Sequence, residues 1–259
     1  MKKLLVGFLT LAAVFTVLPM FAAFEAHVIN VTARIENALS VPLDHINFGT
    51  VFPQEHLDKP LGITLSGSFA DQNRVDNVSY FIRQKPKCAW TWDDGKNFDH
   101  DSTATGHIIL DPQAEGGYRI DCGEPERPEG VPEEATWGVL PSLCEYISKH
   151  PDNQPENDES LHSFHQPWEI VNDVIVWNDT DGLLSKNNPE DMTDNWTIDL
   201  AVPCFGGYCA QDWADFVHGI NEDADPADYT QPIGNEHKVF GCDLWVEVDG
   251  VTADEEVAP

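Results

Sequence analysis

The chain has 259 residues, of which 45 are acidic and 14 are basic, and its formal net charge is −31 at pH 7. A surface this acidic repels the phosphates of nucleic acids and of anionic lipids. The composition therefore argues against nucleic-acid binding and against docking on an anionic membrane. It favours cation binding and solubility, and a well-solvated surface explains it without any specific partner.

Residues 1–23 are typical of a secretory signal peptide. Lys2 and Lys3 precede an uncharged run from Leu4 to Phe24. The small residues Ala22 and Ala23 stand just before its last residue. We expect cleavage after Ala23. The run is also long enough to span a bilayer, so a retained membrane anchor is the alternative.

Six cysteines lie after this leader, at Cys88, Cys122, Cys144, Cys204, Cys209 and Cys242. An even number of cysteines behind a signal peptide predicts disulfides, whose pairing the sequence leaves open. A structural zinc site needs two close ligand pairs, and only Cys204 and Cys209 are close together. We therefore expect disulfides and an oxidising compartment.

The first strand of the mature chain is expected over residues 27–35. Ile29, Val31, Ala33 and Ile35 alternate with polar residues, so they share one face of an extended strand. This strand would begin within a few residues of the expected cleavage site.

Further strands are expected where apolar residues alternate, at 61–65, 78–82, 107–110, 170–177, 196–202 and 240–248. Trp137–Tyr146 should hold one short helix or strand. Asp212 is a candidate N-cap for a short helix over 212–218. Residues 204–209 form a tight loop between two cysteines. Gly, Pro and acidic residues predict long loops at 111–135, 148–168 and 221–236, and an acidic tail at 251–259.

These patterns predict one all-β domain over residues 24–250. Short strands separated by turn-rich loops, with no long amphipathic helix, favour an Ig-like or jelly-roll β-sandwich with long, disulfide-stapled loops.

Enzymatic signatures are missing from the sequence. There is no HExxH, GxSxG, P-loop or dinucleotide-binding fingerprint. Ser, His and Asp residues occur, but without convergent geometry they carry almost no weight. We therefore expect a protein that is not an enzyme and that has no catalytic or cofactor-binding residues.

Two groups of carboxylates are candidate calcium ligands, because calcium prefers six to eight oxygens from closely spaced side chains. The first group is Asp179 and Asp181 in WNDTDG, which resembles part of an EF-hand loop but lacks its final glutamate. The second group is Glu222, Asp223, Asp225 and Asp228. Solvated loops are the alternative in both places, because acidic residues are spread along the whole chain.

Two further stretches have a possible binding role. His162 and His165 would share a face if they lay on a helix and could then bind a metal, but their proline-flanked context favours a solvent-exposed loop. Residues Trp90–Asp101 are aromatic and acidic, and we expect an exposed loop there.

The sequence resembles a known family of secreted proteins. A leader, the strand HVINVTARIE and the segment INFGTVFPQE follow one another as in proteins of the TasA and camelysin type, which Gram-positive bacteria export with a dedicated signal peptidase. The segments DNWTIDLAVPCFGGYCAQDW and VFGCDLWVEV are similar to segments of uncharacterised secreted proteins of uncultured small-genome bacteria.

The resemblance implies a structural protein of the cell surface or of the biofilm matrix. In TasA-type fibres the N-terminal strand completes the sheet of the next subunit. The resemblance therefore makes the strand at 27–35, with Ile29, Val31, Ala33 and Ile35, the candidate donor strand, and pairing within its own sheet is the alternative. The implied partner is a second copy, with cell-surface components as the alternative. The six cysteines depart from the TasA pattern. Camelysin is regarded as a metallopeptidase, but no residues here match that site. The remaining alternative is a calcium-dependent adhesion module, for which the Trp90–Asp101 stretch is a candidate glycan surface.

Overall fold

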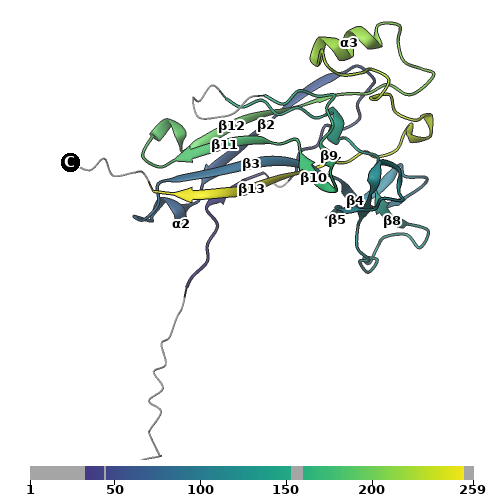
Figure 1. The fold of residues 1–259 in the computed structure, drawn as a ribbon. Coiled ribbons are helices and arrows are strands. Elements are labelled where there is room, and N and C mark those ends of the chain that lie inside the picture. Colours follow the sequence, from purple (N-terminus) through teal and green to yellow (C-terminus); the bar gives the residue numbers. More distant parts are fainter. Residues whose placement is uncertain (1–32, 44, 153–159, 254–259) are drawn as a thin grey trace, which may run out of the picture. The chain divides into compact units, whose positions relative to one another are not determined.

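The computed structural model describes residues 33–43, 45–152 and 160–253 (Figure 1). The chain divides into two compact units, Met1–Ile35 and Glu36–Pro259. All helices and strands of the described residues belong to the second unit. The leader and most of the candidate donor strand lie outside the described residues.

The described part of the chain is mainly β-structure. Its strands are β1 (Leu39–Ser40), β2 (His56–Leu65), β3 (Asn77–Lys85), β4 (Lys87–Trp92), β5 (Asn97–Thr105), β6 (His107–Leu110), β7 (Tyr118–Asp121), β8 (Thr136–Val139), β9 (Trp168–Val171), β10 (Val174–Trp177), β11 (Thr180–Ser185), β12 (Thr193–Ala201) and β13 (Asp243–Thr252). Its helices are α2 (Gly67–Ala70) and α3 (Trp213–Ile220), with the 3₁₀ turns η2 (Glu115–Gly117), η3 (Cys144–Tyr146), η4 (Pro189–Asp191) and η5 (Ile233–Asn235).

Two three-stranded antiparallel sheets enclose the main core. One has the order β1-β2-β12 and the other has the order β11-β3-β13. Strand β3 shows why they pack: Val78, Tyr80 and Ile82 are buried, while the residues between them are only half-buried. An alternating strand buries one face, and here that face meets Leu61, Ile63 and the other apolar residues of the opposite sheet. The prediction of an all-β sandwich is confirmed; its Ig-like or jelly-roll topology stays a prediction.

A buried polar contact joins the two sheets. The Tyr80 hydroxyl donates to the Asp194 carboxylate and accepts a hydrogen bond from Trp196 Nε1 at 2.8 Å. Burial, followed by the negative charge of Asp194, raises the pKa of Tyr80 well above its usual value. Gly182 lies opposite Tyr80 in the sheet, and a Cβ there would lie 2.3 Å from the phenol ring. Glycine is therefore needed at this position to admit the tyrosine.

The segment Ile147–His150 covers the outer edge of β12. The Ser148 N–H donates to Asp199 O, and His150 and Thr197 exchange two backbone hydrogen bonds. Unpaired strand edges invite further pairing, and here the chain itself supplies the neighbour. This corrects the expected loop at 148–168, whose first residues behave as an added strand.

Smaller sheets make up the rest of the described chain. They have the orders β5-β4-β8, β6-β7 and β10-β9. The stretch Trp90–Asp101, expected to be a loop, is a hairpin formed by β4 and β5 around a turn at Asp93–Gly95. The expected loop at 111–135 likewise contains β7, and strand β13 continues through Thr252 into the expected tail.

The cysteines form three disulfides, which confirms that prediction and settles the pairing. They are Cys88–Cys122, Cys144–Cys242 and Cys204–Cys209. The first joins β4 to the residue after β7, the second joins η3 to the residue before β13, and the third closes the short loop 204–209. Disulfides persist in oxidising compartments, so the chain is suited to an extracellular environment.

Candidate functional site

The candidate donor residues are only partly described. Ile29 and Val31 lie outside the described residues, whereas Ala33 and Ile35 are exposed and belong to no strand. The Ile35 side chain is 94% exposed. The described end of the expected strand therefore exposes apolar side chains and is not assigned to a strand.

Strand β13 forms the edge of its sheet (Figure 1). A hydrogen bond from Lys186 N to Asp76 O continues the β11–β3 ladder, so the even-numbered residues of β3 turn their backbone groups to β11. The odd-numbered residues of β3 therefore bond to β13. It follows that Leu244, Val246 and Val248 turn their N–H and C=O groups outward, away from β3.

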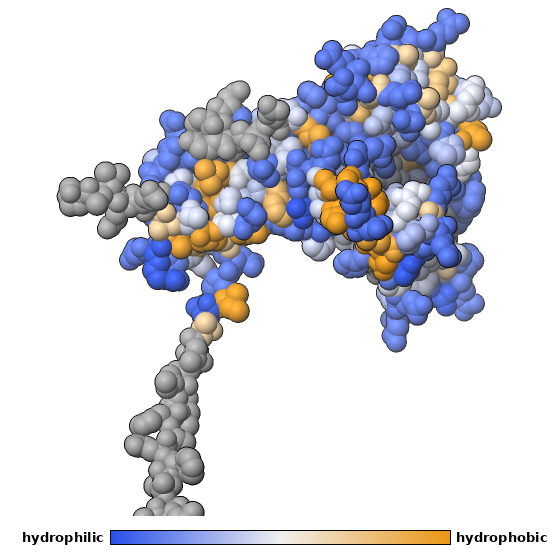
Figure 2. Space-filling model, in the orientation of Figure 1, coloured by the Kyte–Doolittle hydropathy of each residue, from blue (hydrophilic) through white to orange (hydrophobic). Residues whose placement is uncertain are grey.

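The inner face of β13 is incompletely covered. Val248 and Val251 lie opposite Tyr80 and Val78, so they belong to the core-facing side of the sheet, yet they are 44% and 43% exposed. Apolar side chains gather along this strand in the space-filling view (Figure 2). A bulge at Asp249 interrupts the pairing with β3 between them. This edge combines outward backbone groups with accessible apolar surface.

The outer edge of β2 is less suited to accept a strand. Strand β1 pairs with Thr64 and Leu65 alone. Pro60, in the middle of the edge, has no N–H to donate, and the neighbouring Asp58 and Lys59 are exposed. Proline and charged residues are the usual protection of a sheet edge. Strand β13 is therefore the better acceptor.

A polar pocket of about 390 Å³ lies beside the turn of the β4–β5 hairpin. Asp93, Asp94 and Gly95 all adopt left-handed backbone conformations, with φ of 54°, 57° and 79°. Asp93 and Asp94 line the pocket together with Thr91 and Thr136, which are cross-strand neighbours in β4 and β8. Strained turns of this kind occur at ligand sites.

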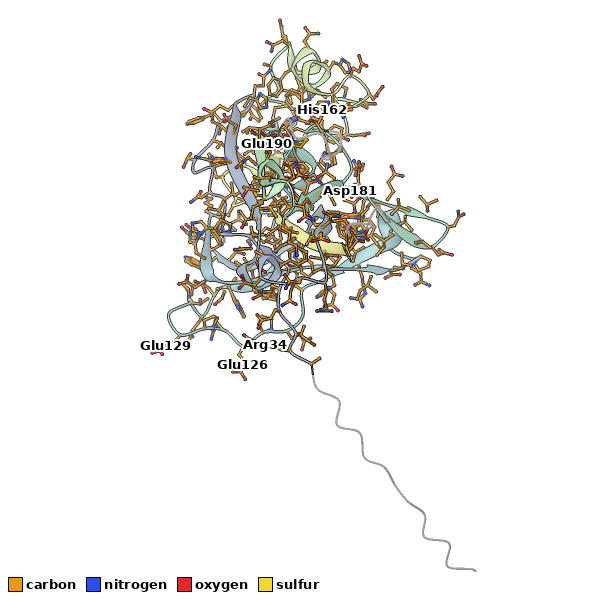
Figure 3. All side chains as sticks on the ribbon, turned by 90° about the vertical axis from the view of Figure 1, so that its left-hand side faces the viewer. Arg34, Glu126, Glu129, His162, Asp181 and Glu190 are labelled. Carbon is orange, nitrogen blue, oxygen red and sulfur yellow. A yellow bond between two sulfur atoms is a disulfide. The ribbon has the colours of Figure 1, made fainter. Side chains whose placement is uncertain are left out.

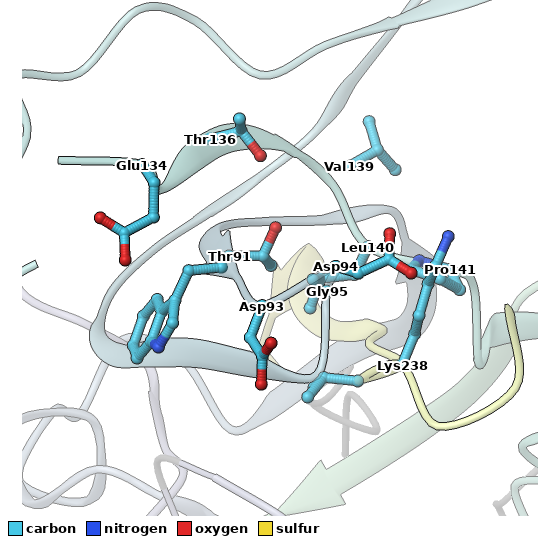
Figure 4. A pocket seen from close by; sticks show the side chains of 12 residues that line it. Thr91, Asp93, Asp94, Gly95, Glu134, Thr136, Val139, Leu140, Pro141 and Lys238 are labelled. Atoms are coloured by element: carbon cyan, nitrogen blue, oxygen red, sulfur yellow. The ribbon is translucent and has the colours of Figure 1, made fainter. Parts of the chain in front are cut away.

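The lining of the pocket also includes one more carboxylate and one ammonium. Glu134 precedes β8, and Lys238 packs its aliphatic stem against Gly95 (Figure 4). Trp92 also lines the pocket. Carboxylates, hydroxyls and an aromatic ring together suit a hydroxyl-rich ligand, which hydrogen-bonds to the former and stacks on the latter.

The candidate calcium ligands are not assembled into a site. Asp179 accepts a hydrogen bond from Arg83 Nε at 2.6 Å, so an ion pair occupies it. The Asp225 carboxylate accepts from the Ala227 N–H and serves a turn. Over residues 33–43, 45–152 and 160–253, no group of three or more His, Cys, Asp or Glu side chains could hold a metal ion.

The other candidate metal ligands lie at two places in the described chain. Asp181 and His162 occupy separate places in Figure 3. Glu222 and Asp223 line a second pocket of about 410 Å³ together with His162. Asp228 is exposed. The sequence spacing therefore placed carboxylates close along the chain without converging them on one point.

The expectation that His165 faces solvent is wrong. Its ring is buried, with Nδ1 2.7 Å from His162 O and Nε2 2.8 Å from Gln84 Oε1. Gln84 in turn lies 3.1 Å from the buried Nζ of Lys149. Sequence reasoning missed this cluster, although Gln84 continues the alternation of Val78, Tyr80 and Ile82 and so falls on the buried face of β3.

Comparisons with known proteins add no relative: no family model, no curated protein and no solved structure matches the chain. Within the part of the chain that the structure describes, no helix is long and apolar enough to cross a bilayer.

Proposed function

We propose that this is a secreted or cell-surface structural protein that assembles by strand donation. Residues 27–35 of one copy, with Ile29, Val31, Ala33 and Ile35 on their apolar face, would add to the edge of β13 in the next copy. The observation that carries the proposal is the edge of β13, where outward backbone groups adjoin the exposed Val248 and Val251.

The donor and the acceptor edge complement each other. An added strand satisfies outward N–H and C=O groups, and its apolar face continues the inner face of the sheet. Burying apolar surface contributes roughly 25 cal/mol per Å², so each partly exposed apolar side chain that the added strand covers favours the contact. The exposed Ile35 has apolar surface to bury in this way.

Negative-stain microscopy and light scattering on the oxidised protein lacking its leader test this function. We expect filaments or a broad high-mass distribution. Ile35→Lys should abolish donation and Val248→Lys should abolish acceptance, because each places a charge in the contact. Val174→Lys is the matched control, since Val174 is an exposed valine of the β9–β10 hairpin.

Mixing the two defective variants makes the test sharper. A copy with Ile35→Lys can still accept a strand and a copy with Val248→Lys can still donate one. Their mixture should therefore give dimers and no longer polymers. A monodisperse monomer in the unaltered protein, or polymers in both single variants, would refute strand donation.

A second candidate function is glycan binding at the pocket beside Asp93–Gly95. It is favoured by three carboxylates, two threonines and Trp92 around one cavity. Calorimetric titration with soluble polysaccharides should give binding that Asp93→Asn and Glu134→Gln weaken, while Glu126→Gln, in the exposed loop of Figure 3, leaves it unchanged. Unchanged affinity in both pocket variants would reject the pocket as the binding site.

A calcium requirement and a metallopeptidase activity have less support. Both need several ligands around one ion, and the residues described here contain no such group. The assembly and binding measurements should be repeated with calcium and with a chelator. A metal-dependent function would be lost with the chelator, whereas strand donation and glycan binding at the pocket would not.

A further inference from the structure

A buried amine lies against a buried carboxamide in the core. The side chains of Lys149 and Gln84 are both fully buried, and Lys149 Nζ lies 3.1 Å from Gln84 Oε1 and 3.1 Å from the carbonyl oxygen of Ile82. Neither partner is a carboxylate. Burial lowers the pKa of Lys149 to about 7, although the charge of Asp179 opposes this shift. A large share of Lys149 is therefore a neutral amine near pH 7, which is the nucleophilic form.

The carboxamide of Gln84 is held in one orientation. Its nitrogen donates to Cys144 O at 2.8 Å and to Ile147 O at 2.9 Å. Its oxygen therefore faces Lys149 Nζ on one side and His165 Nε2, 2.8 Å away, on the other. A hydrogen-bond donor on Oε1 polarises the side-chain carbonyl group of Gln84. The backbone carbonyls of Cys144 and Ile147 accept hydrogen bonds from its amide nitrogen.

His165 can supply the polarising hydrogen bond. Both of its ring nitrogens face carbonyl oxygens, and the neutral ring donates to Gln84 in the tautomer that carries its hydrogen on Nε2. Burial and the positive charge of Lys149 lower the pKa of His165 to about 3. The second of these causes disappears when Lys149 loses its proton.

We propose that Lys149 and Gln84 form an intramolecular isopeptide bond. The Nζ lone pair attacks Cδ of Gln84, and the charge that develops on Oε1 is stabilised by His165. A proton moves from Nζ to the amide nitrogen, the Cδ–Nε2 bond breaks and ammonia leaves. No oxidant or other reactant is needed. The amine must shift by roughly 1 Å from the carbonyl oxygen toward its carbon to reach attack distance.

The bond would join the two sheets of the sandwich. Gln84 lies on β3, whereas Lys149 lies in the segment that pairs along the outer edge of β12. A covalent link at this point would stop the sheets from separating under load. It does not depend on strand donation.

Intact-mass spectrometry of the folded, secreted protein, reduced before measurement, tests the proposal. We expect a mass below that of the sequence by one ammonia, about 17 Da, and a branched peptide that joins the two residues. Lys149→Met and Gln84→Met should each restore the full mass. Lys238→Met is the matched control, because its half-buried amine lies 3.5 Å from the Asn235 side-chain oxygen, away from Gln84. The deficit should persist in that variant.

The role of His165 is tested by the rate of ammonia release after refolding. His165→Gln should slow release by about 100-fold while the far-ultraviolet circular dichroism stays unchanged. The unaltered protein decides the main question even if the variants do not fold. Its full sequence mass after prolonged incubation, or an ammonia loss that maps to other residues, would overturn the proposal.

Discussion

Asp199 is a carboxylate that two histidines hold at the edge of the core. Its Oδ2 lies 3.0 Å from His150 Nε2, and its Oδ1 lies 3.0 Å from His56 Nε2. Burial by itself would raise the pKa of Asp199, but these hydrogen bonds, with that of His150 foremost, lower it to about 2. The folded state therefore binds a proton at this site less readily than the unfolded chain does.

This shift predicts a loss of stability in acid. Because the folded pKa lies below the unfolded value, the contribution of Asp199 is complete above about pH 4 and disappears as the pH falls toward 2, and it amounts to roughly 2 kcal/mol. Urea unfolding of the unaltered protein and of Asp199→Asn measures the difference. The two free energies should differ at about pH 6, and most of that difference should be lost near pH 2.5. A difference that does not change with pH would contradict this prediction.

The buried polar residues were the least predictable part of the candidate sites. Alternation along β3 places Gln84 on the apolar face, which is the signal that a polar group there needs partners. Its partners, Lys149 and His165, come from more than sixty residues away in the sequence. Local patterns carry no information about such contacts, because only the packing of the two sheets brings them together.

Strands were predictable where one face is buried. The expected strands at 78–82 and 196–202 overlap β3 and β12, and the expected helix at 212–218 corresponds to α3. Asp212 is the N-cap residue of that helix, but its side chain accepts from Gln54 and makes no capping bond. The β4–β5 hairpin escaped prediction because its mixed aromatic and acidic residues lack a two-residue period.

The disulfides differ in how much chain they close, and this predicts unequal contributions to stability. Cys144–Cys242 spans 98 residues and Cys204–Cys209 spans 5. In the chain-entropy account these loops correspond to about 4.7 and about 2 kcal/mol. Replacing the first pair by alanines should therefore lower the urea midpoint more than replacing the second pair. Equal midpoints in the two double variants would contradict this account.

The whole molecule carries a strong negative charge, which opposes any association between copies. Acidic side chains project around the molecule, with Glu126 and Glu129 at the tip of one loop (Figure 3). Among the few cations, Arg83, Lys85 and Lys87 each contact a carboxylate. Copies with a net charge of −31 repel one another until salt screens the charge.

Assembly should therefore strengthen with ionic strength. The screening length falls from roughly 30 Å at 0.01 M salt to about 8 Å at 0.15 M, which is short compared with the molecule. Light scattering across this range should show polymers growing as sodium chloride is added, while Val248→Lys stays monomeric throughout. Polymers that dissolve as salt rises would mean that opposite charges, and not the apolar face of an added strand, hold the copies together.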